Sequence, residues 1–162
     1  MNSPTRYLPI LAGALAMVGL AGAANAATEL NVGGSSAGTN FATDVPLNLC
    51  DAGVAGPPNT YPNRYSSANN KLITWVCQRA TADIIIRYAA TSSVDGIVKV
   101  SQPATDPASN MNFLDHTLTT GCTGPTVVTR ADGRKYNNTI NCANGNTISK
   151  PAHMGASDVS GS

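Results

Sequence analysis

The chain is poor in charged and aromatic residues: of its 162 residues, 12% are Asp, Glu, Lys or Arg and 5% are Phe, Trp or Tyr. Lys and Arg number 10 against 9 Asp and Glu, so there is no appreciable basic excess. Proteins that bind nucleic acid or a membrane surface ordinarily carry such an excess, and the composition therefore argues against both partners. The 42% of hydrophobic residues is still enough for a packed core.

Histidine is scarce as well, since only His116 and His153 are present. Neither lies in the sequence context of a nucleophile elbow or at the spacing of a metal site. A hydrolase therefore has little support. We expect no enzymatic activity, no metal and no cofactor.

The first 26 residues have the layout of a secretory signal peptide. A single basic residue, Arg6, precedes an apolar run that extends from residue 7 to about residue 20, and the small residues 24–26 come before Ala27. A permanent membrane anchor needs about 20 strongly apolar residues, whereas Gly and Ala dilute this run. We expect cleavage after Ala26, a location in the periplasm or outside the cell, and no membrane anchor in the mature protein.

All four cysteines lie in the exported part, where an oxidising environment favours disulfides. Four cysteines allow three pairings. The order along the chain favours Cys50 with Cys77 and Cys122 with Cys142, because each pair brackets a polar, turn-rich stretch. The alternative, a zinc site, would require close Cys-x-x-Cys pairs or a nearby His, and the sequence has no such pair.

A first strand–turn–helix unit begins the mature chain. Leu30 and Val32 belong to a short alternating strand, and a Gly/Ser turn follows at residues 33–36. Ser36 or Thr39 is the candidate N-cap of the helix. The helix itself is indicated by apolar side chains at intervals of four, Phe41, Val45 and Leu49.

A second unit of the same kind lies in the middle of the chain. Residues 84–86 are three consecutive isoleucines, as in a strand that is buried on both faces. Ser92 and Ser93 follow, and Asp95 stands three residues after Ser92, as in a capping box. The apolar face of the predicted helix is formed by Val94, Ile97 and Val98.

The rest of the chain is rich in turn residues. Residues 51–70 are predicted to form a loop, and residues 71–78 fit either a strand or the end of a helix. Residues from about 102 to 150 are interpreted as an inserted β-rich excursion closed by Cys122 and Cys142, with a hairpin at residues 131–133. A short buried strand within residues 151–159 then returns to the main fold. This order predicts an α/β fold with a parallel sheet and crossover helices.

The two Gly/Ser turns are candidate anion sites, because backbone N–H groups and the helix dipole meet where a strand opens into a helix. In a parallel sheet both turns lie at the carboxyl edge, where ligands bind. Ordinary N-caps are the alternative explanation for each Ser-Ser pair. Asp158 follows the third strand at the same edge, and a carboxylate there suits an anion that keeps a proton, such as hydrogen phosphate, better than sulfate. A turn or cap is the alternative role for Asp158.

Three segments, "GGSSAG", "YAATSSVDGI" and "HMGASDV", resemble the corresponding segments of phosphate-binding periplasmic proteins of the type II binding-protein fold, which serve phosphate ABC transporters. The resemblance covers roughly residues 27–50, 84–101 and 150–160. It implies an N-terminal fragment of such a protein, in which the signal peptide is followed at residues 27–162 by an incomplete first lobe.

In this family the three segments hold one side of a dehydrated phosphate. The resemblance implies that the phosphate-binding residues are Ser35 and Ser36 in the first turn, with Thr39 as an alternative hydroxyl, Ser92 and Ser93 in the second, and Asp158 as the acceptor of the ligand's proton. Residues 94–96 depart from the glycine-rich run that is common in the family, and Asp95 there would repel an anion.

The function that the resemblance implies is a monomeric solute-binding protein for phosphate or a related oxyanion, which feeds an ABC transporter permease. An exported structural or surface protein that uses the same fold without a transport role is the alternative.

Overall fold

The computed structural model describes residues 27–51, 60–80 and 82–157, and the predicted signal peptide and Asp158 lie outside these ranges. The first half of the chain contains β1 (Thr28–Gly34), α1 (Gly38–Asp44), η1 (Val45–Leu49), β2 (Asn63–Ser67), β3 (Leu72–Arg79) and β4 (Ala82–Ala90). The second half contains α2 (Ser93–Ser101), η3 (Pro107–Ser109), β5 (Asn110–Leu114), β6 (Thr123–Thr129), β7 (Lys135–Cys142), β8 (Thr147–Pro151) and β9 (Met154–Ala156).

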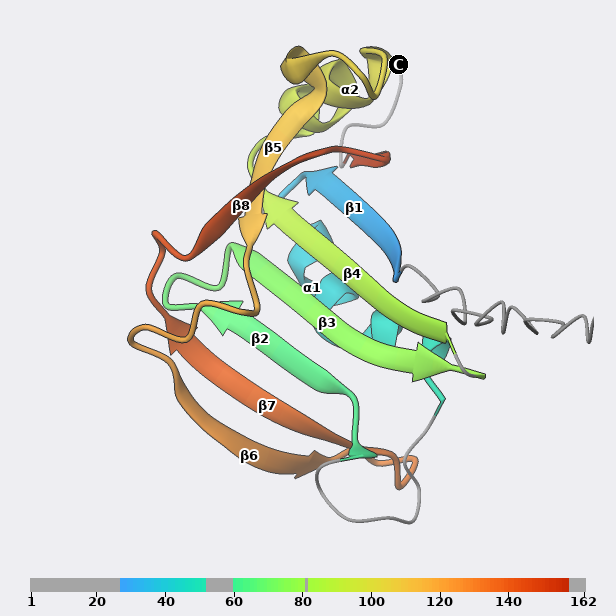
Figure 1. Ribbon diagram of the computed structural model, residues 1–162, viewed down its shortest axis with the longest axis vertical. Coiled ribbons are helices and arrows are strands. Elements are labelled where there is room, and N and C mark those ends of the chain that lie inside the picture. Colours follow the sequence, from blue (N-terminus) through green and yellow to red (C-terminus); the bar gives the residue numbers. More distant parts are fainter. Residues whose placement is uncertain (1–26, 52–59, 81, 158–162) are drawn as a thin grey trace, which may run out of the picture.

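Seven strands form one mixed sheet in the order β6-β7-β2-β3-β4-β1-β9 (Figure 1). Strand β1 pairs in parallel with β4 and with β9, and β2 pairs in parallel with β7. The pairs β2–β3, β3–β4 and β6–β7 are antiparallel. The α/β prediction is therefore confirmed, but the expectation of a parallel sheet is wrong: the sheet is mixed, with parallel pairing in β4-β1-β9 and between β2 and β7, and antiparallel hairpins between the other neighbours.

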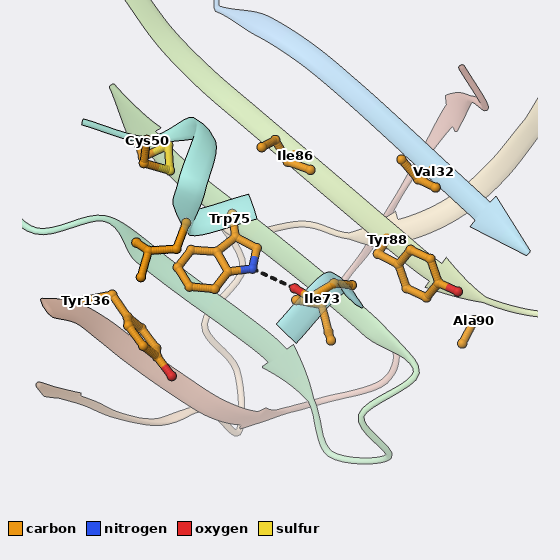
Figure 2. Close-up of a cluster of buried hydrophobic side chains, with 11 residues drawn as sticks. Val32, Cys50, Ile73, Trp75, Ile86, Tyr88, Ala90 and Tyr136 are labelled. Atoms are coloured by element: carbon orange, nitrogen blue, oxygen red, sulfur yellow. Dashed lines mark hydrogen bonds between the residues drawn. A yellow bond between two sulfur atoms is a disulfide. The ribbon is translucent and has the colours of Figure 1, made fainter. Parts of the chain in front are cut away.

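The first core lies between the sheet and α1. Alternate residues of β4, among them Ile86 and Tyr88, point into this core (Figure 2). Trp75 of β3 is 1% exposed and packs beside Tyr136 of β7, with ring centroids 5.1 Å apart. The indole Nε1–H of Trp75 donates a hydrogen bond of 2.8 Å to the carbonyl oxygen of Ala42 in α1. This bond satisfies the one polar atom of a buried indole and holds α1 against the middle of the sheet.

The opposite face of the sheet is covered by α2 and by an antiparallel ribbon of β5 and β8. Met111 and Phe113 of β5 are buried against Ala89 of β4 and Ala152. Successive residues of a strand point to opposite faces, so Ala89 belongs to this core whereas Tyr88 and Ala90 belong to the first. The sheet is thus covered on both faces around the carboxyl half of β4, where residues 86–90 are buried, whereas Ile84 and Ile85 of the isoleucine run are only half-buried.

A partly buried ion cluster lies on the ribbon side of the sheet. Arg87 of β4 is 3% exposed, and its Nη1 is 3.0 Å from the carboxylate of Glu29 in β1. The same carboxylate is 3.2 Å from the Lys150 ammonium of β8, and Arg87 also donates to the side-chain oxygen of Asn31 at 3.2 Å. Burial raises the pKa of the Glu29 carboxyl, but the hydrogen bonds from Arg87 and Lys150 outweigh this effect and bring the pKa below its ordinary value.

Both predicted disulfides are confirmed: Cys50 is bonded to Cys77, and Cys122 to Cys142. All four sulfur atoms are therefore in disulfides, so no thiolate remains for the alternative zinc site. Two disulfides indicate a protein that matures in an oxidising compartment. Among the described residues, no helix is long and apolar enough to cross a membrane.

Two other expectations about the chain are wrong. Residues 51–70 are not all loop, because they contain β2, whereas the strand alternative for residues 71–78 is confirmed by β3. The region 102–150 is β-rich and contains the Cys122–Cys142 disulfide as expected, and its strands join the main fold, since β7 pairs with β2 inside the main sheet and β5–β8 covers the sheet. The apolar face of α2 does not face the sheet: Val94, Ile97 and Val98 are all exposed.

We expect Glu29→Gln to lower the free energy of unfolding by about 2 kcal/mol at neutral pH, because it leaves Arg87 buried without its counter-charge. The folded-state pKa of Glu29 is lowered, so its contribution is complete above the unfolded-state value and is lost as the pH falls through the folded-state value. The stability difference between the two proteins should therefore shrink in acid.

Denaturant unfolding at neutral pH and in acid would measure this difference. Asp95→Asn is a matched control, because this exposed carboxylate has no side-chain partner among the described residues. An equal effect of both substitutions at neutral pH would contradict the proposed role of the ion cluster.

Candidate functional site at the carboxyl ends of three parallel strands

The three segments singled out in the sequence meet at one edge of the sheet. Gly34 of β1 is in register with Ala90 of β4 on one side and with Ala156 of β9 on the other. Beyond these residues, the N–H of Thr91 donates to the carbonyl of Gly34 at 2.8 Å, and the N–H of Ser35 donates to the carbonyl of Ala156 at 2.9 Å. The predicted convergence of the first two turns and the third strand is therefore present in the structure.

The chain leaves this edge in opposite directions. After β1 it enters α1, which covers the first core, and after β4 it enters α2, which lies on the opposite face against β1 and β9. Because β1 and β4 are neighbours, their connections leave this edge on opposite faces of the sheet, and a ligand crevice is expected between them. Such a reversal of strand order is the usual ligand position in open α/β sheets.

Glycines bring the backbone of α2 into direct contact with the sheet at this edge. A Cβ atom on Gly96 would lie 2.5 Å from the carbonyl oxygen of Gly33 and 2.7 Å from the Cα of Gly34. A Cβ atom on Gly155 of β9 would lie 2.7 Å from the carbonyl oxygen of Gly96. The first turn of α2 is therefore positioned by backbone contact with both β1 and β9.

In the first turn, Ser35 and Ser36 have different surroundings. Ser35 is 3% exposed, its Oγ accepts the N–H of Ala37 at 3.1 Å, and its carbonyl accepts the hydroxyl of Tyr88. Ser36 is exposed, whereas Thr39 is half-buried within α1. The structure thus gives Ser35 a local structural role and leaves Ser36 as the open hydroxyl of this turn.

In the second turn, Ser92 is the N-cap of α2, and its Oγ accepts the N–H of Asp95 at 3.1 Å. This bond confirms the first half of the predicted capping box. Ser93 is the first residue of the helix and is half-buried. The exposed Asp95 in the first turn interacts favourably with the helix dipole but adds negative charge at this edge of the sheet.

Asp158, the proposed proton acceptor, lies outside the described residues. Described structure at the third segment ends with β9 and the exposed Ser157. The expected contact of Asp158 with a ligand therefore stays a prediction.

Sequence reasoning missed the polar residues that place β9. Asn31 of β1 donates its N–H to Nδ1 of His153 at 3.1 Å and accepts the N–H of His153 at its carbonyl oxygen, at 2.7 Å. Its side-chain amide also donates to the carbonyl of Pro151 at 3.1 Å. His153 is thus engaged as a backbone clamp, and its Nδ1 is already occupied as an acceptor. The only sequence signal for this role of Asn31 was its position as a single asparagine within an otherwise uninterrupted strand.

The second histidine is part of the surroundings of the ion cluster. The ring of His116 lies 5.9 Å from that of Tyr65, and its buried Nδ1 has no hydrogen-bond partner among the described residues. Burial lowers the pKa of His116, and the positive charge of Arg87 lowers it further. The described residues contain no cluster of His, Cys, Asp or Glu side chains that could hold a metal ion.

A hollow of about 510 Å³ lies elsewhere, at the end of the sheet where β3 meets β4, and its lining includes Tyr61, Gln78 and Asp83. It borders Asp51 and Thr60, the two residues that flank the undescribed range 52–59. None of the predicted phosphate-binding residues that the structure describes lines this hollow. We therefore place the candidate site where the strand order reverses and the three segments converge, rather than in this hollow.

No protein-family model, curated protein or solved structure matches the chain.

We expect Gly96→Ala to destabilise the protein by about 2 kcal/mol through overpacking. The sign of the change in stability is diagnostic, because a Gly to Ala substitution inside a helix otherwise stabilises the protein by about 1 kcal/mol. Gly145→Ala is the control, since a Cβ atom there would meet nothing within 4 Å. Thermal unfolding of both variants tests the contact, and a more stable Gly96→Ala protein would show that α2 does not lie on the β1 backbone.

Proposed function

We propose that the chain is a secreted or periplasmic solute-binding protein for phosphate or a related oxyanion, which delivers its ligand to an ABC transporter permease. One observation carries the proposal: the turns after β1 and β4 and the end of β9 lie together at a point where the strand order reverses. The resemblance of the same three segments to phosphate-binding proteins of the type II fold gives the ligand class.

The chemistry of the crevice suits an anion that is held by hydrogen bonds. The hydroxyls of Ser36 and Ser92 are exposed at the edge, and the first turn of α2 contributes the positive end of its dipole. The Ser92 Oγ accepts from the backbone, which leaves its own O–H free to donate to a ligand. No described lysine or arginine is required in this scheme, so specificity would depend on the number and direction of neutral donors.

Binding by this chain should be weak. Ser36, Thr91 and Ser92 are exposed, so each hydrogen bond to an anion replaces one to water and yields little net free energy. Titration with phosphate, followed by NMR of the backbone amides, should shift the signals of residues 35–37 and 91–95 more than those of the β6–β7 hairpin. Unchanged signals at both turns under saturating phosphate would refute the proposal.

The role proposed for Asp158 has a sharper test. We expect Asp158→Asn to weaken phosphate binding by about 1.5–3 kcal/mol, as for a hydrogen bond to a charged group. The same change should favour sulfate relative to phosphate, because an amide donates to either anion and no longer repels a fully ionised one.

Ser92→Ala is the matched comparison, because the loss of a hydroxyl donor should weaken the binding of phosphate and of sulfate alike. If Asp158 is only a cap or turn residue, Asn replaces it almost equally well and the phosphate-to-sulfate ratio stays the same. That result would remove the argument for a protonated anion while leaving the crevice itself in place.

An exported surface or structural protein without a transported ligand is the second candidate. Its support is the apolar surface of α2, where Val94, Ile97 and Val98 are each at least 49% exposed. Apolar side chains gathered at one place commonly mark a contact with another protein. The NMR titration distinguishes the two candidates, because only the first predicts a response of the two turns to phosphate.

A further inference from the structure

One reactive dipeptide is outside the candidate site: Asn144-Gly145 is the only Asn-Gly sequence in the chain. It forms the turn between β7 and β8, which is closed by a hydrogen bond of 2.9 Å from the N–H of Asn146 to the carbonyl of Ala143. We propose that Asn144 is a site of spontaneous deamidation in the folded protein, where it converts slowly to aspartate and isoaspartate.

The reaction needs only water as a co-reactant. The backbone nitrogen of Gly145 attacks the side-chain carbonyl carbon Cγ of Asn144 and forms a new N–Cγ bond. The Cγ–Nδ2 bond breaks, and the side-chain nitrogen leaves as ammonia with the proton that Gly145 has lost. Water then opens the five-membered imide at either carbonyl, which gives aspartate when one C–N bond breaks and isoaspartate when the other does.

The surroundings of the turn leave both reacting groups accessible. Asn144 and Gly145 are exposed, and a Cβ atom on Gly145 would meet nothing within 4 Å. Within the part of the chain that the structure describes, the Asn144 side chain and the N–H of Gly145 have no hydrogen-bond partner. The nucleophile is therefore neither shielded by a neighbour nor held in a hydrogen bond that would have to break first.

Two related dipeptides show what protection looks like in this fold. In Asp95-Gly96 the N–H of Gly96 donates to the carbonyl of Ser92 at 3.1 Å, within the first turn of α2. In Asp132-Gly133 the N–H of Gly133 donates to the carbonyl of Arg130 at 2.9 Å. Both nucleophilic nitrogens are thus engaged, in contrast to that of Gly145.

The carboxylate of Asp132 is protected as well. It accepts hydrogen bonds from the side chain and the N–H of Arg134, and these bonds lower its pKa, which favours the ionised form. An ionised carboxylate is a poor acceptor for a nucleophile.

The neighbouring Asn146 serves as an internal comparison. It is 7% exposed, and its side-chain nitrogen donates to the carbonyls of Leu118 at 2.9 Å and Thr120 at 3.0 Å. Thr147 follows Asn146, so the backbone nitrogen that would attack belongs to a residue with a branched side chain. Of the two asparagines in this turn, we therefore expect only Asn144 to react.

The product differs from the original protein in two ways. Each event adds one negative charge to a chain with nearly balanced charges. Isoaspartate also lengthens the main chain by one carbon, two residues after Cys142 and its disulfide. The protein should therefore separate with age into forms of different charge that share one fold.

The test is prolonged incubation of the folded, disulfide-bonded protein at mildly alkaline pH, followed by ion-exchange chromatography and peptide mapping by mass spectrometry. We expect a more acidic species to accumulate, with ammonia released in equal amount and the change located at Asn144. Asn146 should remain intact in the same sample.

Gly145→Ala is the main control, because it blocks approach to the nitrogen without filling occupied space; we expect loss of the acidic species over the same period. Asn144→Gln keeps a side-chain amide at this position and should also abolish the acidic species. The proposal is wrong if Asn144 stays intact in the folded protein, if it reacts only after denaturation, or if Gly145→Ala reacts as fast as the original chain.

Discussion

Strand β1 has parallel neighbours on both sides, and the positions of the candidate site residues follow from this double pairing. At its end, Gly34 accepts the N–H of Thr91 from the β4 side, while the next residue, Ser35, donates to Ala156 of β9. A strand paired on only one side would leave one of these turns without a fixed position. Because the bonds involve backbone atoms, the geometry at this edge depends little on side-chain packing. It depends instead on residues small enough for the three segments to approach, which accounts for Gly34, Gly96 and Gly155.

The ion cluster supports the same pairing from the ribbon side. Arg87 in β4 and Glu29 in β1 link the two neighbouring strands, and Lys150 links Glu29 to the ribbon. A buried guanidinium is tolerated only with such partners, because taking its charge out of water is costly. Asn31 and His153 then fix the chain that leads from the ribbon into β9. The ion cluster and the contacts between Asn31 and His153 thus connect β1 with β4, with the ribbon and with the segment that forms the third strand of the trio.

Local sequence signals were sufficient for some of these features. The isoleucine run predicted β4, the serines predicted the start of α2, and the bracketing of turn-rich stretches predicted both disulfides. Each of these depends on residues that are close in sequence or on a simple pairing order. The pairing of β2 with β7 was missed, because nothing local identifies a partner 74 residues away, such as Asn138 for Arg64.

The orientation of α2 shows a different limit of sequence reasoning. A helical pattern of apolar residues ordinarily identifies the face that is buried, but here Gly96 is the buried residue and Val94, Ile97 and Val98 are exposed. The glycine allows a backbone contact that apolar periodicity does not reveal. Arg87 was likewise passed over, although a single charge within an apolar strand, together with the only glutamate in the chain, is a signal for a buried pair.

The separation of Asn31 and His153, which is 122 residues, has a consequence for the order of folding. Closing so long a loop costs chain entropy before any contact compensates for it, and contacts of this kind slow folding. The β3–β4 hairpin joins neighbouring segments and has no such delay. The edge where the three segments meet should therefore be among the last parts of the molecule to take shape. During that interval one edge of β1 is unpaired. The chain is then most susceptible to pairing with a wrong partner.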